Sequence, residues 1–578
     1  MQSGSLTFPI LFAAVIALLA LIGLRQRKEA DAKLTKALID SFGTNPDEPG
    51  YALKSMTAER YAQVPAYYLH HPAAFQIDDI TWNDLEMDRI YQRINQCMCA
   101  AGEEYLYYLL RTPAGRSTDL AYTEKQLSFA SEDADSRLKL QKLLHGISTP
   151  GKYSLYQYLD LLDGLPEQSA LIHIVLDVLL ILSFIVMITA GGFGVLFFIA
   201  MLAVNVVTYF RQKAAVEPYL VSFAYLLRMV RAAGPVSEVP AEAFSDELSR
   251  LSQLHRSFGG FTRGAWLLVR SGEGSGNPLD ILLDYVRIVF HLDLIKYARM
   301  LREVKNRGRD FDEMVTILGR LDAAVSIASF RSSLKNGFCV PGTAEYAEGK
   351  TPLLFEADGL YHPLIPEPVK NSIRADRCVL LTGSNASGKS TFLKASALAV
   401  LLGETIGTVC ADSCRFTFFR ICSSMALRDN LQGSESYFIV EIKSLKRILD
   451  ASGEENAAPV LAFVDEVLRG TNTVERISAG AEVLRGFSEN GILCFAATHD
   501  LELTELLADC YDNYHFREEV RGEDIFFPYL LMPGKATTRN AILLLKTIGY
   551  DDGIVNRAAE RAAGFIETGK WNTIDAEK

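Results

Sequence analysis

Residues 378–402 read CVLLTGSNASGKSTFLKASALAVLL, and this stretch decides the fold of the carboxy-terminal part of the chain. An apolar strand runs directly into a GxxxxGK[ST] loop, and the loop runs into an apolar helix, which is the context that a phosphate-binding loop requires. The glycines let backbone N–H groups close around phosphate oxygens at the N-terminus of the helix. The predicted phosphate-binding residues are Gly383, Ser384, Asn385, Ala386, Ser387, Gly388, Lys389, Ser390 and Thr391.

Residues 460–466, VLAFVDE, form a second apolar run that ends in two acids. In the loop, Lys389 is expected to neutralise the β- and γ-phosphate oxygens, and the Ser390 hydroxyl can ligate Mg²⁺. At the end of the second run, Asp465 is expected to hold the same Mg²⁺, and Glu466 to polarise the attacking water. The sequence therefore predicts ATP and Mg²⁺ as cofactors.

A third apolar run, residues 492–498, ends at His499, where a polar side chain can sense the γ-phosphate. An adjacent Asp-Glu pair followed by a strand-end histidine is characteristic of ABC-like ATPases. From residue 353 onward, short apolar runs alternate with helical segments. We predict an α/β P-loop (ABC-like) ATPase domain at the C-terminus, preceded by an all-α core or lever region that transmembrane helices interrupt.

Four segments of this domain resemble, in order and spacing, the ATPase motifs of the MutS DNA mismatch-repair family. His362-Pro363 and the tail from Pro533 resemble further segments of that family. The LSGGQ-type signature that an ABC transporter ATPase would need is absent from the sequence. The four segments are residues 383–391, 429–441 (DNLQGSESYFIVE), 465–473 (DEVLRGTNT) and Thr498-His499.

The resemblance implies a homodimer with two composite ATP sites, in which the signature motif of one subunit completes the phosphate loop of the other. Ser436 would then approach the γ-phosphate of the partner, although a helix cap is the alternative role for this serine. Asn385 would contact the phosphate or the lytic water, beside the catalytic Glu466 and His499. The family also implies that ATP hydrolysis opens and closes the dimer, and that DNA is a partner.

The sequence departs from the family pattern at several positions. Ser384 replaces a proline of the loop, Ser387 replaces a glycine, and Glu435 replaces a basic residue of the signature. We expect phosphate binding to survive these changes and hydrolysis to be slow. Residues 25–81 are too few for the mismatch-recognition domain of the family, so we expect a truncated variant.

The net charge of the chain is −12, so any DNA contact must come from a local basic face. This acidic balance and the expected truncation leave a second function open. In that alternative, the same dimer switch moves membrane helices and acts on membrane or protein partners without nucleic acid. The nine cysteines are scattered and form no CxxC pair, which is typical of reduced, cytosolic cysteines.

Two stretches are long and apolar enough for membrane helices. Residues 6–24 predict one crossing, with a cleaved signal peptide as the alternative. Residues 171–210 predict a membrane hairpin, with a buried helical hairpin as the alternative. Basic residues at 25–28 and 211–213 follow the first and third spans. By the positive-inside rule we expect a multi-pass protein of the cell membrane whose ATPase domain lies in the cytoplasm.

The predicted organisation has five parts. They are an N-terminal transmembrane anchor (1–28), the first part of the helical core (29–170), the transmembrane hairpin (171–210), the second part of the helical core or lever (211–340), and the MutS-like ATPase domain (341–578).

Overall fold

A computed structural model describes most of the 578 residues, and these form two compact units. The first unit consists of Met1–Pro72, Ile94–Tyr108 and Glu124–Ser333, and the second of Ala73–Arg93, Leu109–Thr123 and Leu334–Lys578. The described ranges are 7–49, 51–53, 56–148, 154–165, 169–265, 285–344, 353–384, 387–425, 437–454, 457–469, 471–521, 524–536 and 541–571.

The first unit is helical throughout its described part. Helix α17 lies at its centre, and every residue from Leu321 to Arg331 is buried. The buried Asp322 carboxylate accepts hydrogen bonds from the backbone N–H groups of Met98 and Cys99, just before α6 begins. The helices are α1 (Thr7–Ser41), α2 (Ala58–Tyr61), α3 (Ala66–His70), α6 (Ala100–Arg111, which ends in the second unit), α7 (Glu124–Glu132), α8 (Ala134–His145), α9 (Leu155–Asp163), α10 (Ala170–Thr189), α11 (Gly191–Val216), α12 (Leu220–Ser237), α13 (Ser245–Ser257), α14 (Gly259–Thr262), α16 (Leu292–Asn306) and α17 (Gly308–Ser333).

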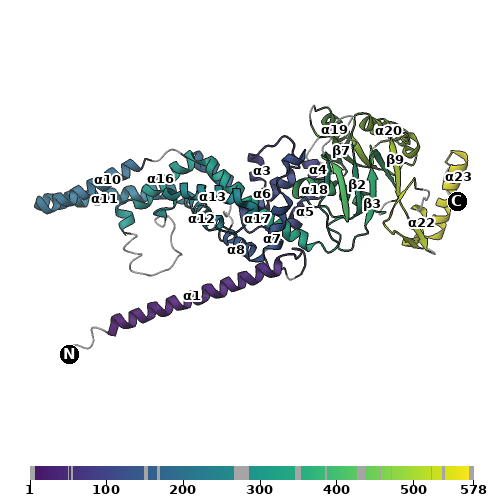
Figure 1. Cartoon of the computed structure of the whole chain (residues 1–578). Helices are drawn as coiled ribbons and strands as arrows, with labels where there is room; N and C mark the ends of the chain where they lie inside the picture. The colour runs from purple at the N-terminus through teal and green to yellow at the C-terminus, as the bar shows by residue number, and fades with distance from the viewer. Residues whose placement is uncertain are drawn as a thin grey trace. The chain divides into compact units, whose positions relative to one another are not determined.

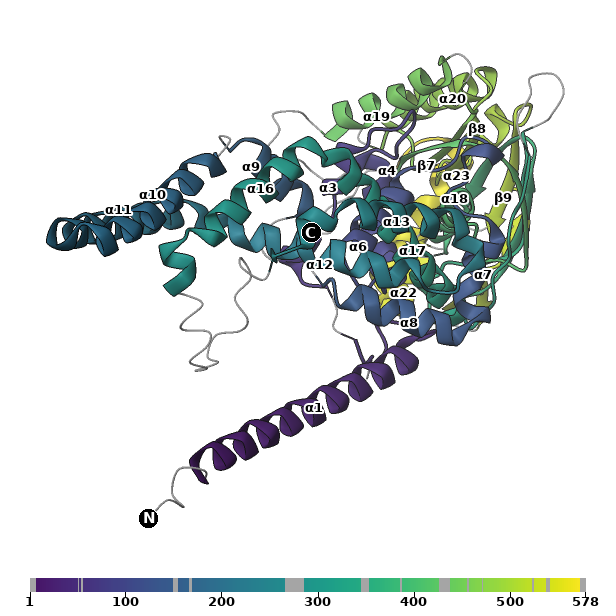
Figure 2. The ribbon, with the colours of Figure 1, turned by 60° about the vertical axis from the view of Figure 1, so that its left-hand side comes forward.

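Helices α10 and α11 form the hairpin that the sequence predicts, side by side in both views (Figures 1 and 2). The turn falls at Gly191, whose φ of +60° lies in the left-handed region that favours glycine. Within the described residues, these are the two helices long and apolar enough to cross a membrane. At the base of the hairpin, Lys213 forms an ion pair of 2.6 Å with the buried Asp293 of α16. The hairpin is therefore tied to the helical unit by an ion pair between the partly exposed Lys213 and the buried Asp293.

The second unit contains a six-stranded sheet in the order β12-β9-β4-β8-β7-β6. All neighbours are parallel except β12, which is antiparallel to β9. Because β4, β8 and β7 are adjacent and parallel, the ends of the three predicted strands meet at one edge of the sheet. The strands are β4 (Cys378–Thr382), β6 (Arg420–Ser424), β7 (Val460–Asp465), β8 (Leu493–Ala497), β9 (Tyr511–Phe516) and β12 (Leu531–Pro533).

Helices and a smaller sheet surround this sheet. Phe355 of the smaller sheet packs edge-on against Phe495 of β8, with ring centroids 5.6 Å apart. Helices α19 and α20 lie next to one another (Figure 2). The helices are α18 (Lys389–Ile406), α19 (Tyr437–Ser452), α20 (Thr473–Glu489), α21 (Leu503–Leu506), α22 (Ala541–Ile548) and α23 (Asp552–Thr568). The smaller sheet has the order β1-β5-β2-β3, with β1 (Gly342–Ala344), β5 (Ser413–Thr417), β2 (Phe355–Leu360) and β3 (Asn371–Ala375), and β10 (Glu519–Arg521) pairs with β11 (Asp524–Phe526).

Two earlier helices, α4 (Asp79–Asp84) and all but the last residue of α5 (Met87–Ile94), lie in the segment Ala73–Arg93 of the second unit. The buried Asp84 accepts hydrogen bonds from the Ser423 hydroxyl (2.7 Å) and the Met425 N–H (2.9 Å). Thr81 accepts a further bond from the Ser423 N–H (3.1 Å). Because β6 is the last strand of the sheet, α4 satisfies backbone groups that the edge leaves without a strand partner. The sequence did not indicate that this segment packs with the six-stranded sheet.

Candidate nucleotide site

The phosphate loop leaves β4 and enters α18 through two glycines in the left-handed region, Gly383 (φ +141°) and Gly388 (φ +108°). A side chain at Gly388 would also meet the ring of Tyr529, 3.3 Å from its Cβ position. Lys389 is buried, and its Nζ donates hydrogen bonds of 2.8 Å to the carbonyl oxygens of Gly383 and Ser384. The Lys389 ammonium therefore lies inside the loop and is bound by two of the loop's own carbonyl oxygens.

Lys389 lies between opposing electrostatic effects. Burial lowers the pKa of this lysine, while the nearby carboxylates of Asp465 and Glu466 raise it, and the net direction is downward. An anionic phosphate would favour the charged ammonium in the same way as these carboxylates do. A phosphate bound in the loop would therefore stabilise the charged form of Lys389.

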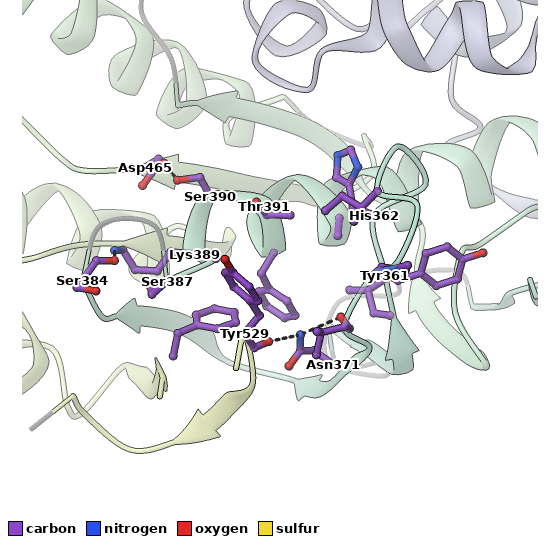
Figure 3. A pocket seen from close by; sticks show the side chains of 18 of the residues that line it. Tyr361, His362, Asn371, Ser384, Ser387, Lys389, Ser390, Thr391, Asp465 and Tyr529 are labelled. Atoms are coloured by element: carbon purple, nitrogen blue, oxygen red, sulfur yellow. Dashed lines mark hydrogen bonds between the residues drawn. The ribbon is translucent and has the colours of Figure 1, made fainter. Parts of the chain in front are cut away.

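Ser390 and Asp465 meet where the loop approaches the end of β7 (Figure 3). The Ser390 hydroxyl donates a hydrogen bond of 2.5 Å to Asp465 Oδ2. Burial raises the pKa of Asp465, and the Ser390 hydrogen bond opposes that rise. A hydroxyl and a carboxylate oxygen at this separation are hard ligands of the kind that Mg²⁺ prefers, so these two residues fit the predicted metal.

Glu466 contacts both His499 and Arg469. Its Oε1 lies 3.1 Å from His499 Nε2, and its Oε2 accepts a hydrogen bond from Arg469 Nε. Burial raises the pKa of Glu466, but the hydrogen bonds from His499 and Arg469 outweigh burial and lower it to about 2. The Glu466 carboxylate is therefore ionised at neutral pH, as a proton acceptor must be.

His499 Nε2 also lies 3.3 Å from Lys389 Nζ. One imidazole nitrogen is unable to donate to Glu466 and accept from Lys389 at the same time. Because Glu466 is ionised and Lys389 already donates to two carbonyl oxygens, we assign the Nε2 proton to the bond with Glu466. His499 thus donates to the Glu466 carboxylate and lies beside Lys389 without a hydrogen bond to it.

The turn after β7 carries backbone strain. Glu466 has φ +57° and Leu468 has φ +56°, in a region that residues with a Cβ seldom adopt. Each such residue costs on the order of 1–3 kcal/mol. The surrounding structure must therefore hold the turn in place.

A cavity of about 540 Å³ lies along the loop, within the range of ligand pockets. Ser384, Ser387, Gly388, Lys389, Ser390, Thr391, Asp465, Glu466 and His499 line one part of it. Tyr529, Asn371 and Phe516 line another part, and the Asn371 amide donates a 3.0 Å hydrogen bond to the Tyr529 carbonyl (Figure 3). Sequence reasoning missed these last three residues, which no motif marks.

Most of the predicted site residues come together around this cavity. Gly383 belongs to the same loop through its bond to Lys389. His362 lines the cavity, where burial and the nearby Lys394 lower its pKa to about 4. Asn385, Ala386 and Ser436 lie outside the described residues. The roles of all these residues in binding and catalysis stay predictions.

Comparison with protein families adds an independent observation, because residues 379–565 match the family model described as MutS domain V. This part of the chain is a domain of the MutS family. The family membership predicted from the four motifs is confirmed. MutS domain V is a P-loop ATPase-type domain, in agreement with the predicted fold of this part of the chain.

Curated relatives carry the name DNA mismatch repair protein MutS. The protein from Desulforamulus reducens is 28% identical over 311 residues, which are 51% of this chain and 35% of that relative. The Thermotoga petrophila protein is 31% identical over 225 residues, 37% of this chain and 27% of the relative. The Thermotoga maritima protein is 31% identical over 215 residues, 36% of this chain and 27% of the relative. The chain therefore matches about a third or less of the length of these MutS proteins.

Proposed function

We propose that this MutS-family chain is a membrane-held ATPase that binds and hydrolyses ATP and couples hydrolysis to the opening and closing of a dimer. One observation carries the proposal. Lys389, the Ser390–Asp465 pair and the Glu466–His499 pair lie around one cavity at the ends of adjacent parallel strands. These are a phosphate-binding cation, a pair of metal-ligating oxygens and an ionised proton acceptor, the parts that phosphoryl transfer to water requires.

Each residue has a distinct part in the proposed reaction. Lys389 binds β- and γ-phosphate oxygens, and Ser390 and Asp465 would hold Mg²⁺, which neutralises phosphate charge when bound. Glu466 accepts a proton from the water that attacks the γ-phosphorus, and the products are ADP and inorganic phosphate. His499 orients the Glu466 carboxylate through its 3.1 Å contact.

The dimer and the DNA partner rest on the family. On this proposal, Ser436 of one subunit reaches the γ-phosphate bound by the other, and Asn385 contacts the phosphate or the attacking water. The curated relatives are named for DNA mismatch repair, which supports DNA as the ligand that the switch controls. We extend this role to the present chain as binding of DNA, with no assignment of the DNA structure.

The hairpin supports the membrane part of the proposal. Helices of 20 and 26 residues rise about 30 and 39 Å, enough to cross a hydrocarbon core of about 30 Å. Large apolar side chains are exposed along both helices, including Ile185, Ile188, Phe193, Leu196, Ile199 and Val207. With α1 as a further span, the proposed location is the cell membrane, with the ATPase domain in the cytoplasm.

Fractionation tests this location. The full-length chain should remain in the membrane fraction after alkaline carbonate washing. A variant in which a short Gly/Ser linker replaces residues 170–216 should be extracted more readily, because it loses the larger share of the apolar surface. Complete release of the unchanged chain by carbonate would contradict the membrane proposal.

The exposed hairpin also favours a second function, in which the dimer switch moves membrane helices and acts on membrane or protein partners without nucleic acid. Steady-state ATP hydrolysis by the detergent-solubilised chain separates the two. If DNA is the ligand, duplex, mismatched or branched DNA should change the turnover rate, and DNA binding should weaken steeply with salt. A rate that is the same with and without each DNA would remove the DNA role and leave the membrane function.

A further inference from the structure

Glu441 of α19 contacts the turn that carries the proposed catalytic carboxylate. Its Oε1 accepts a hydrogen bond of 2.5 Å from the Leu468 N–H and one of 3.3 Å from the Arg469 N–H. The Glu441 side chain is buried, with only 4% of the residue exposed. Its second oxygen, Oε2, has no hydrogen-bond partner among the described residues. Burial of a carboxylate with one unpaired oxygen costs folding free energy, so a compensating role for Glu441 is expected.

The backbone geometry of the turn supplies that reason. Glu466 and Leu468 both have positive φ, so this conformation persists only where neighbouring groups hold it. Two successive N–H groups of the turn point at one carboxylate oxygen. Glu441 therefore fixes the path of the backbone two and three residues after Glu466.

The same contact also determines the position of Arg469. The Arg469 backbone N–H donates to Glu441, and the Arg469 guanidinium donates to the Glu466 carboxylate. Apolar packing ties the same elements together, because Leu445 and Ile448 of α19 share one core cluster with Val467 and Leu468. A shift of α19 would thus move both the backbone and the arginine that hold Glu466.

We propose that Glu441 is a positioning residue for ATP hydrolysis, which holds the turn Val467–Arg469 so that Glu466 points at the attacking water. The inference rests on the proposed ATPase function and adds a residue that touches neither nucleotide nor water. It also connects α19, whose described residues begin at Tyr437, to the proposed catalytic carboxylate of its own subunit.

The same unit offers a matched control. Glu404 of α18 is also buried, accepts a 2.7 Å hydrogen bond from the Phe419 N–H, and has an Oε2 without a partner among the described residues. Glu404 does not line the cavity. Removal of either carboxylate deletes a buried backbone contact, but only Glu441 holds the catalytic turn.

The experiment compares Glu441→Ala, Glu441→Gln and Glu404→Ala in the full-length chain. It measures ATP affinity with a fluorescent ATP analogue, single-turnover hydrolysis, and Tm. Glu441→Ala should lower the hydrolysis rate about 100-fold, because a displacement of about 1 Å at a reacting group costs that much. Its ATP affinity should stay within about threefold, since the phosphate loop is unchanged. Glu441→Gln keeps a carbonyl acceptor and should restore most of the rate.

The control separates positioning from general stability. Glu404→Ala should lower Tm and leave the single-turnover rate of the folded protein close to that of the unchanged chain. Equal rate losses in Glu441→Ala and Glu404→Ala, or no loss in either, would overturn the inference. If Glu441→Ala does not fold, Glu441→Asp replaces it, since its shorter carboxylate should not reach the turn, and an unchanged rate in that variant overturns the inference as well. Absence of Lys389-dependent hydrolysis in the unchanged chain would instead reject the proposed ATPase function.

Discussion

Ser390 donates a 2.5 Å hydrogen bond to Asp465, which joins the first turn of α18 to the end of β7 across 75 positions of sequence. The contact brings together the two oxygen ligands that the sequence assigns to Mg²⁺. It also holds the start of α18 against the end of β7. The consequences for metal binding, nucleotide binding and catalysis are separable by substitution.

Ser390→Ala should raise the Mg²⁺ concentration needed for half-maximal ATP hydrolysis by about tenfold or more, since loss of even an outer-shell partner costs about 10- to 100-fold in metal affinity. Mg²⁺-independent binding of ATP should change little, because Lys389 and the loop backbone remain. The rate of ATP hydrolysis and the binding of ATP are each measured over a range of Mg²⁺ concentrations. An unchanged Mg²⁺ requirement would show that Ser390 is not a ligand.

Lys389→Ala should abolish nucleotide binding, because it removes the cation that is expected to neutralise the β- and γ-phosphate oxygens. The matched control is Lys394→Ala on the same helix. Lys394 forms a 2.7 Å ion pair with Glu86 and does not line the cavity. Equilibrium binding of a fluorescent ATP analogue distinguishes the two variants, and equal affinity in both would refute the role of Lys389.

Glu466→Gln should keep ATP bound and lower the hydrolysis rate by about 100-fold or more, as expected for loss of a general base. Trapped ATP should also hold the dimer closed. Size-exclusion chromatography of the detergent-solubilised chain with ATP should then show a larger dimer fraction for Glu466→Gln than for Glu505→Gln, an exposed control. Hydrolysis at the normal rate would mean that Glu466 is not the proton acceptor.

The pH dependence should reveal the contact between Arg469 and Glu466. Because the pKa of Glu466 is lowered to about 2, its ionisation should not limit the rate down to about pH 4. Arg469→Ala removes one of the groups that lower this pKa, so the acid limb of the rate profile should move to higher pH. Arg485→Ala, which breaks an exposed pair with Asp509, is the control. Superimposable profiles for the two variants would contradict the prediction.

The lowered pKa of Glu466 also predicts how the free energy of unfolding depends on pH. Since folding lowers the pKa of Glu466 from 4.5 to about 2, its contribution to the free energy of unfolding is present above about pH 4.5. That contribution is lost as the pH falls toward 2. Denaturant unfolding of Glu466→Gln and the unchanged chain should therefore differ more at pH 6 than at pH 3.

Asp84→Ala should lower the free energy of unfolding by about 1–3 kcal/mol, because it leaves the Ser423 hydroxyl and the Met425 N–H without their buried acceptor. Asn83→Ala, at an exposed position of the same helix, should change it by less than about 0.5 kcal/mol. Urea unfolding, followed by tryptophan fluorescence, measures both. Equal stability of the two variants would show that α4 does not stabilise the sheet edge.

The local parts of the site were predictable because each depends on a short run of sequence. The phosphate loop needs glycines, a lysine and a serine at fixed spacing, and Asp465 and Glu466 follow directly from the end of an apolar strand. Parallel pairing then forces the ends of such strands to one edge. The turn of the hairpin at Gly191 followed in the same way from two apolar runs separated by glycines.

Sequence by itself predicted the phosphate loop, the MutS motifs and the apolar hairpin, since local spacing and composition encode them. Only the tertiary structure decided which distant groups hold the site. Glu441 lies 27 positions from Leu468, and Asp84 lies 339 positions from Ser423, so no periodicity links either pair. Buried backbone N–H groups need an acceptor wherever the chain can bring one. The folded arrangement therefore brings these two carboxylates to their partners, Glu441 to the turn after β7 and Asp84 to the edge of the sheet.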